Sequence, residues 1–263
     1  MALTETATPG IGQKMEHFDV LIVGAGISGV GTAFHMKDQA PDKSFVVLEA
    51  YETFGGTWHM HKYPGVRSDS DLYTFGYRFK PWTGTPIASS AEIKKYMGEV
   101  IEDNHLDEHI RYRHRITGAA WSSADNRWTV DVTNLATQEQ FQMSANFLWM
   151  CQGYYKHAEG YTPEWPNMSS FKGQIVHPQT WPDDLDYKDK RVVVIGSGAT
   201  SATLVPAMAK DVAHITMLQR SPTYFVPGRN ANELADTLRQ LEIDEMWIHE
   251  IVRRKVLFDQ KVI

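Results

Sequence analysis

The fold of this chain is decided by residues 19–29, which read Asp-Val-Leu-Ile-Val-Gly-Ala-Gly-Ile-Ser-Gly. The apolar run at the start is typical of a strand buried on both faces. The glycines that follow have the spacing Gly-x-Gly-x-x-Gly. Gly24 permits a tight turn, Gly26 lets the backbone approach a pyrophosphate, and Gly29 lets the next helix pack closely on the strand. The stretch therefore predicts a dinucleotide site in a Rossmann-like unit.

The residue that ends the next predicted strand indicates which dinucleotide suits this site. The strand covers residues 44–48 and is followed by Glu49, twenty residues after Gly29. A carboxylate at this position accepts hydrogen bonds from ribose hydroxyls and repels a 2′-phosphate. The first site is therefore predicted to bind FAD or NAD and not NADP.

A second unit of the same design follows downstream. An apolar strand at residues 192–195 leads into a glycine loop in which Ser201 replaces the third glycine. Its small side chain still lets the helix pack on the strand. The next strand, residues 214–218, leads to Arg220 and Ser221 instead of an acid, and these side chains can bind a 2′-phosphate. This site is predicted to prefer NADPH, with contacts from Gly196, Gly198, Thr200, Arg220 and Ser221.

Two aromatic motifs accompany the glycine loops. Residues 55–69 fit the pattern Gly-Gly-x-Trp-x-x-x-x-Tyr-Pro-Gly-x-x-x-Asp. Residues 171–182 fit Phe-x-Gly-x-x-x-His-x-x-x-Trp-Pro. Glycine and proline can hold the first loop against a flat isoalloxazine ring, with Trp58 and Tyr63 as aromatic surface beside it. The first motif therefore favours FAD over NAD.

Both motifs resemble signatures of the Baeyer-Villiger monooxygenases, flavoproteins related to the flavin-containing monooxygenases. Trp181 and Pro182 favour the first of these families, because the second usually carries another kind of aromatic there. The resemblance covers nearly all of residues 18–263, but only the N-terminal part of such an enzyme. The predicted FAD contacts are Gly24, Gly26, Gly29, Glu49, Gly56, Thr57, Trp58, Tyr63 and Asp69.

The resemblance implies a reaction and three catalytic residues. NADPH would pass hydride to FAD, and one oxygen atom of O2 would be inserted next to a ketone carbonyl to give an ester or lactone. Asp69 would lie near the flavin and pair with an arginine from later sequence. His177 and Trp181 would act at a hinge, where they couple cofactor movement to closure.

Two alternatives remain open at this point. The first is a flavin monooxygenase that oxygenates a nitrogen or sulfur atom. The second is a non-catalytic nucleotide-binding fragment that needs a partner for its missing C-terminal half. Because the family's arginine would be absent, we expect little ketone oxygenation by the 263-residue chain alone. Open strand edges would favour a partner chain or self-association.

The predicted fold class is α/β, with two Rossmann-like dinucleotide-binding domains built on parallel sheets. The first carries a small antiparallel meander at residues 110–150, and the second is incomplete. The predicted boundaries are a disordered tail at 1–16, an FAD-binding domain at 17–168, a linker with the second motif at 169–186, and a partial NADP-binding domain at 187–263.

Composition excludes several other classes. A net charge of −6 gives no broad basic field for nucleic acid or an anionic membrane. The single cysteine, Cys151, excludes the paired redox cysteines of disulfide reductases. Without a signal peptide or a membrane-spanning run, the protein is expected to be cytoplasmic. Residues 105–109 match a His-x-x-Glu-His zinc pattern, but no third ligand is evident, and no metal is predicted.

Overall fold

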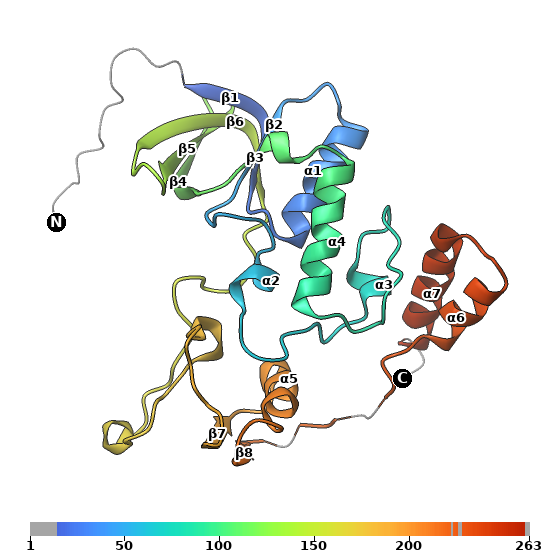
Figure 1. The fold of residues 1–263 in the computed structure, drawn as a ribbon. Helices are drawn as coiled ribbons and strands as arrows, with labels where there is room; N and C mark the ends of the chain where they lie inside the picture. Colours follow the sequence, from blue (N-terminus) through green and yellow to red (C-terminus); the bar gives the residue numbers. More distant parts are fainter. Residues whose placement is uncertain (1–14, 222, 226–227, 261–263) are drawn as a thin grey trace. The chain divides into compact units, whose positions relative to one another are not determined.

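The computed structural model describes residues 15–221, 223–225 and 228–260 (Figure 1). These residues form two compact units. Unit 1 takes its described residues from Met1–His59 and Tyr96–Tyr154, and unit 2 takes its own from Met60–Lys95 and Tyr155–Ile263. The predicted tail at 1–16 falls almost wholly outside the described residues, although strand β1 already begins at Glu16.

Unit 1 is built on a six-stranded sheet with the order β3-β2-β1-β6-β5-β4. The parallel part joins β1 to β2, β2 to β3 and β1 to β6, and the antiparallel part joins β4 to β5 and β5 to β6. The strands are β1 (Glu16–Val23), β2 (Phe45–Leu48), β3 (Ile110–Arg111), β4 (His114–Ser122), β5 (Arg127–Asn134) and β6 (Gln140–Met150). The predicted fold class, a parallel sheet with an antiparallel meander, is confirmed.

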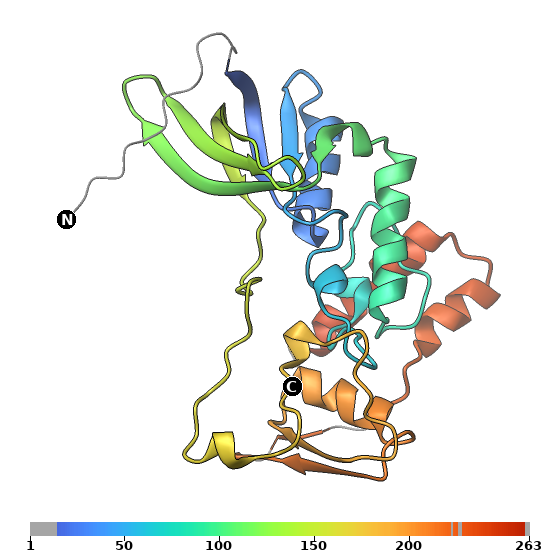
Figure 2. The ribbon, with the colours of Figure 1, turned by 60° about the vertical axis from the view of Figure 1, so that its left-hand side comes forward.

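Strand β6 connects the two parts of the sheet. It is one continuous strand of 11 residues, although its sequence resembles a meander strand at the start and a buried parallel strand at the end. Its first half pairs antiparallel with β5, and β6 from Met143 to Met150 pairs parallel with β1. The meander is therefore a direct extension of the Rossmann sheet (Figure 2, green strands).

Burial of apolar side chains explains why these segments are strands and helices. All four residues of β2 are buried, as are Leu21 and Ile22 of β1. Helix α1 (Ile27–Gln39) follows the first glycine loop. Helix α4 (Ser90–Asp103) begins in unit 2, ends in unit 1, and buries the apolar face formed by Ile93, Met97, Val100 and Ile101. The remaining short helices are α2 (Thr57–Met60), α3 (Leu72–Phe75), η1 (Asp107–His109), η2 (Met168–Ser170) and η3 (Pro178–Thr180).

Unit 2 contains a second, smaller Rossmann-like element. Strands β7 (Arg191–Ile195) and β8 (His214–Leu218) are parallel and are joined through helix α5 (Ala199–Met208). Leu204 and Met208 of α5 pack against one face of this pair. The side chains of Val193, Ile195 and Leu218 alternate onto the other face, where they are 61%, 56% and 54% exposed.

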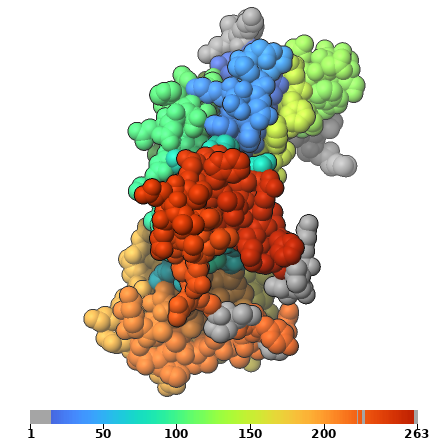
Figure 3. Space-filling model, turned by 90° about the vertical axis from the view of Figure 1, so that its right-hand side faces the viewer, coloured from blue at the N-terminus to red at the C-terminus, as the bar shows by residue number. Residues whose placement is uncertain are grey.

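Two further helices, α6 (Glu233–Gln240) and α7 (Glu245–Asp259), form one block in unit 2 (Figure 3, red). Each begins at a capping side chain, because Asn232 accepts from Ala235 N and Asp244 accepts from Met246 N. Arg253 of α7 donates to the carbonyl oxygens of Tyr73 and Thr74, so α7 is docked on α3. Within the described ranges, no helix combines the length and apolar character that crossing a membrane requires.

His249 is buried in this docked block. It is 1% exposed, and its Nδ1 accepts a hydrogen bond of 3.2 Å from the backbone N–H of Trp82. The neutral ring must then carry its proton on Nε2, a buried atom for which the structure shows no hydrogen-bond partner. Burial, followed by the charge of Arg253, lowers the pKa of His249 from its usual value of 6.5.

The buried His249 predicts acid-sensitive stability. Because the pKa of His249 is lower in the folded state, the unfolded state takes up a proton first as the pH falls. The free energy of unfolding is therefore highest above about pH 6.5 and decreases below it, by at most about 1.4 kcal/mol per pH unit. Urea unfolding at pH 7.5 and 5.5 measures the effect. His249→Asn retains an acceptor for Trp82 N without titrating, and we expect a weaker pH dependence in this variant. The same dependence in both proteins would contradict the assignment.

Candidate functional site

The first glycine loop has the geometry that its motif requires. Gly24 has a φ of +95°, and a Cβ there would stand 2.9 Å from the carbonyl oxygen of Cys151. A Cβ on Gly29 would stand 1.8 Å from the carbonyl oxygen of Gly24. Any side chain at either position would overlap backbone atoms. These two glycines are therefore needed for folding, whatever the loop binds.

Gly26 differs from these two glycines. A Cβ there would meet only Gly56 Cα, at an ordinary contact distance of 3.7 Å, and its φ of −74° suits any residue. Gly26 is also the N-cap of α1, where it contributes no capping side chain, and the first turn of α1 carries no acid. The N-terminus of a helix attracts phosphate through its backbone N–H groups and dipole. The fold alone does not explain the glycine at this position, whereas close approach of a pyrophosphate does.

The first aromatic motif, residues 55–69, begins directly against the first glycine loop. Gly55 N donates to Ala25 O at 3.0 Å, and Gly56 has a φ of +52°. A Cβ on Gly56 would stand 3.0 Å from Gly26 Cα. Helix α2 starts at the next residue and contains the half-buried Thr57 and Trp58. Unit 1 therefore brings seven predicted FAD contacts into one region: Gly24, Gly26, Gly29, Glu49, Gly56, Thr57 and Trp58.

Glu49 is tied to the same loop. Its side chain is 5% exposed, with Oε2 accepting from Ala25 N at 2.7 Å and Oε1 accepting from Tyr51 N at 2.8 Å. Burial, followed by the negative charge of Glu49, raises the pKa of Tyr112 to about 12. Each carboxylate oxygen has a second lone pair for a ribose hydroxyl. Glu49 thus holds the glycine loop in place, a role that the sequence did not reveal.

Three residues of unit 1 with potential chemistry have structural contacts instead. Cys151 N donates to Val23 O, and burial raises the pKa of its thiol, so a packing role suits it better than a nucleophilic one. His109 of the zinc-like pattern stacks on Phe45 at 4.1 Å between ring centroids, and Glu108 lies 3.5 Å from Lys37 Nζ. Across the residues that the structure covers, no three potential ligands gather in a metal-binding arrangement.

The Tyr-Pro-Gly half of the first aromatic motif lies in unit 2, against α5. Tyr63 is 6% exposed and packs with Leu204 and Met208. Gly65 has a φ of +79°, and a Cβ there would stand 2.7 Å from Thr203 O. The ring of Tyr63 is therefore used for packing against a helix of unit 2. Its predicted contact with flavin stays a prediction.

Asp69 lies at the end of this motif on an exposed loop. Its Oδ1 accepts from Ser70 Oγ at 3.2 Å. The preceding residue, Ser68, is buried and pairs with Ala88 in both directions: Ser68 N donates to Ala88 O, and Ala88 N donates to Ser68 Oγ. Asp69 thus extends from a fixed point of the backbone with its carboxylate accessible.

The second glycine loop, also in unit 2, is more open than the first. Gly196 has a φ of +116°, and a Cβ on Gly198 would meet no atom within 4 Å. Thr200 is half-buried in the first turn of α5, and Arg220 and Ser221 are exposed after β8. A hydroxyl pair, Ser197 Oγ and Thr223 Oγ1 at 2.6 Å, joins the loop to the segment after β8. No sequence motif indicated this pair.

His177 and Trp181 of the second aromatic motif, residues 171–182 and from here on called the fingerprint, also lie in unit 2. His177 is the N-cap of η3 and accepts from Gln179 N at 3.1 Å. Trp181 packs on the same cluster as Tyr63 and Leu204 of α5. Burial, followed by the charges of His177 and His157, lowers the pKa of His61. The two aromatic motifs therefore share α5 as a support.

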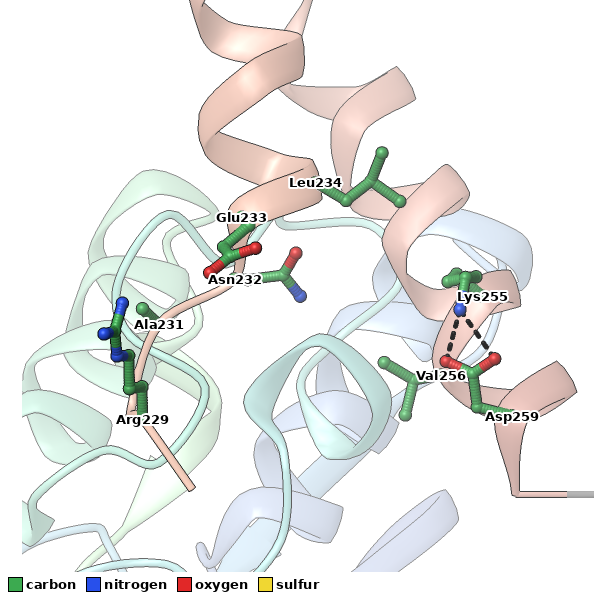
Figure 4. Close-up of a pocket in the computed structure, with 8 residues that line it drawn as sticks. All are labelled: Arg229, Ala231, Asn232, Glu233, Leu234, Lys255, Val256 and Asp259. Atoms are coloured by element: carbon green, nitrogen blue, oxygen red, sulfur yellow. Dashed lines mark hydrogen bonds and ion pairs between the residues drawn. The ribbon is translucent and has the colours of Figure 1, made fainter. Parts of the chain in front are cut away.

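A separate pocket of about 490 Å³ in unit 2 contains none of the predicted site residues. Lys255 Nζ lies 2.6 Å from both carboxylate oxygens of Asp259, so two of the four charged side chains that line this pocket are paired with each other (Figure 4). It is lined by Arg229, Ala231, Asn232, Glu233, Leu234, Lys255, Val256 and Asp259. Nothing in this set matches the chemistry of the glycine loops.

Comparison with known families agrees with this geometry. Residues 86–234 match the family described as flavin-binding monooxygenase-like, and residues 22–83 match an NAD(P)-binding Rossmann-like domain. The chain belongs to the flavin-binding monooxygenase-like family. It is 56% identical to the FAD-containing monooxygenase EthA of Mycolicibacterium smegmatis over 80% of this chain and 43% of that protein. For EthA of Mycobacterium tuberculosis H37Rv the identity is 47%, over 94% of this chain and 50% of the relative.

Solved structures give the same result. A steroid monooxygenase bound to NADP matches with a TM-score of 0.68 and 32% identity, over 80% of this chain and 40% of the other. A cyclohexanone-bound cyclohexanone monooxygenase matches with a TM-score of 0.70 and 26% identity, over 87% and 45%. The chain thus spans about half the length of the curated relatives it matches. The predicted resemblance is confirmed, as are FAD and NADP as cofactors of this family.

The glycine geometry predicts opposite effects for two alanine variants. Gly29→Ala forces a Cβ into Gly24 O and should destabilise unit 1 by more than about 3 kcal/mol. Gly26→Ala fits the fold and should leave the melting temperature nearly unchanged, yet weaken FAD binding by about tenfold or more, because its Cβ blocks the pyrophosphate. Thermal unfolding and FAD titration measure both effects. Equal destabilisation by the two variants would show that Gly26 is only structural.

Proposed function

We propose that unit 1 binds FAD, that unit 2 binds NADPH, and that the chain takes part in a Baeyer-Villiger oxidation. In this reaction one oxygen atom of O2 is inserted next to a ketone carbonyl, and the product is an ester or lactone. The observation that carries the cofactor assignment is the contrast between the two strand ends. Glu49 follows β2 and contacts the first glycine loop, whereas Arg220 follows β8 beside the second.

The residues of unit 1 fit FAD. The open approach at Gly26 and the N-terminus of α1 suit a pyrophosphate, and the free lone pairs of Glu49 suit a ribose. Gly56, Thr57 and Trp58 continue this surface directly. When bound, FAD would accept hydride and supply the oxygen chemistry, while the protein binds and orients it.

The residues of unit 2 fit NADPH. Gly198 leaves open space in front of α5, and the exposed Arg220 and Ser221 offer a guanidinium and a hydroxyl to a 2′-phosphate. The Ser197–Thr223 hydroxyl pair keeps the glycine loop close to this segment. His177 and Trp181, held on the loop near α5, are proposed to adjust during closure and not to touch substrate.

Two observations favour insertion next to a carbonyl. The fingerprint ends in Trp181-Pro182, the form typical of the Baeyer-Villiger branch. Two cyclohexanone monooxygenase structures are described as bound to cyclohexanone and to ε-caprolactone, and these molecules differ by one inserted oxygen atom. The second match has a TM-score of 0.72 and 25% identity, over 88% of this chain and 45% of the other.

Oxygenation of nitrogen or sulfur is the second candidate. The matched family is described only as flavin-binding monooxygenase-like, and the EthA relatives only as FAD-containing monooxygenases, so both reactions agree with these names. A non-catalytic nucleotide-binding role is the candidate from another class. Reduction of flavin by NADPH is the step that distinguishes it from both oxygenases.

The direct test uses the purified chain incubated with FAD. A yellow protein that retains flavin through gel filtration, and that NADPH bleaches without oxygen, is the expected result. Because little oxygenation is expected of this chain alone, product analysis with a panel of ketones, sulfides and amines uses a version extended through the family's C-terminal half, and it separates the two oxygenase candidates. A colourless protein would exclude the proposed FAD site, and bound flavin that NADPH leaves oxidised would favour the non-catalytic role.

Arg220 gives a prediction of its own. Arg220→Ala should weaken NADPH binding about tenfold to a hundredfold by removing a charged bond to the 2′-phosphate, with less than about a threefold effect on NADH. Arg191→Ala is the matched control, because it removes the same charge from an exposed position at the opposite end of the β7–β8 pair. Equal losses for NADPH and NADH in the Arg220 variant would place Arg220 away from the 2′-phosphate.

A further inference from the structure

The side chain of Asn230 is paired with a backbone segment far away in the sequence. Its Nδ2 donates to Ile87 O at 2.8 Å, and its Oδ1 accepts from Ile87 N at 2.8 Å. A primary amide presents one donor and one acceptor side by side, as a neighbouring β-strand does. Asn230 therefore binds residue 87 in the manner of a strand partner. Both residues belong to unit 2.

The opposite side of this segment holds the loop that carries Asp69. Ala88 pairs with Ser68 through Ser68 N to Ala88 O at 2.8 Å and Ala88 N to Ser68 Oγ at 3.1 Å. Pro86 O accepts from Leu72 N at 2.9 Å. Residues 86 and 88 thus hold the two ends of the loop 68–72.

The backbone groups of residues 86–88 alternate in direction, and this explains why some bind the loop and others bind Asn230. In an extended segment, backbone groups of successive residues face opposite sides. The groups of Pro86 and Ala88 face the loop, and those of Ile87 face Asn230. A short ladder continues this pairing, with Ser90 N donating to Val66 O at 3.1 Å. If the Asn230 amide is removed, Ile87 loses both of its bonds to Asn230, and its N–H loses the partner that the structure shows for it, while Ile87 O still accepts from Thr85 Oγ1 at 3.1 Å.

We propose that Asn230 is a positioning residue for Asp69. Its amide fixes residues 86–88, and these fix the loop from which the Asp69 carboxylate extends. The inference rests on the proposed function, because Asp69 matters only if it faces bound flavin. Asn230 follows Arg220 on the segment after β8, so the segment that carries the predicted 2′-phosphate contact also holds the Asp69 loop.

Other contacts keep the surrounding structure in place without Asn230. Arg253 binds the carbonyls of Tyr73 and Thr74, and His249 binds Trp82 N, so residues 73–82 stay docked on α7. Asp71 caps α3 by accepting from Tyr73 N. Loss of the Asn230 amide should therefore loosen residues 68 and 86–88 while unit 2 remains folded.

The experiment measures hydrogen exchange of backbone amides in Asn230→Ala and Asn230→Asp, together with the spectrum of bound FAD. The aspartate keeps an acceptor for Ile87 N but places a carboxylate oxygen against Ile87 O. Asn146→Ala is the matched control. Asn146 is an exposed amide in unit 1, and the one side-chain hydrogen bond that the structure shows for it joins its Nδ2 to Asp19 Oδ1.

We expect exchange at Ile87, Ala88 and Ser68 to become at least tenfold faster in both Asn230 variants, with little change in melting temperature and none in the control. The visible spectrum of bound FAD should shift, because the resemblance implies that Asp69 lies near the flavin and its carboxylate would no longer be fixed. A change at Ile87 alone, or an unshifted flavin spectrum, would overturn the inference. A wild-type chain that binds no FAD would overturn the proposed function, and the exchange data would still decide whether Asn230 orders the loop.

Discussion

The proposed flavin site depends on a close contact between two backbones, in which the glycine at position 56 has a φ of +52°. Gly55 N donates a hydrogen bond to Ala25 O at 3.0 Å. A Cβ on Gly56 would stand only 3.0 Å from Gly26 Cα. Glu49 fixes the same turn through Ala25 N. Because the two glycine motifs form one backbone surface, a phosphate approaching Gly26 also meets the residues that start α2. The flavin motif is thus an extension of the dinucleotide motif.

A second consequence concerns the aromatic motif at residues 55–69. Its Gly-Gly-x-Trp half belongs to unit 1, whereas its Tyr-Pro-Gly-x-x-x-Asp half belongs to unit 2 and packs on α5. The fingerprint residue Trp181 packs on the same helix. One helix that follows the second glycine loop therefore supports residues from both aromatic motifs. Within unit 2, the helix that follows the proposed NADPH site thus contacts Tyr63 and Gly65 of the motif that ends at Asp69, and Trp181 of the fingerprint.

Local chemistry explains what could be predicted from the sequence. The strand, glycine loop and helix at residues 19–39 follow from turn geometry and burial, and the apolar face of α4 follows from helical spacing. The continuous strand β6 could not be predicted, because its length depends on pairing with β1 and β5 at once. The bond of Glu49 to the glycine loop and the Asn230 amide pair were equally hidden, since both join residues far apart in sequence.

We propose that one chain carries two nucleotide sites of different specificity, an acidic one for FAD and a basic one for NADP. Calorimetric titration of the wild-type chain with FAD, first alone and then with saturating NADP⁺, distinguishes two sites from one. With two separate sites we expect one FAD per chain in both titrations, with NADP⁺ bound separately at one per chain. Displacement of FAD by NADP⁺, or a total of one nucleotide per chain, would contradict it.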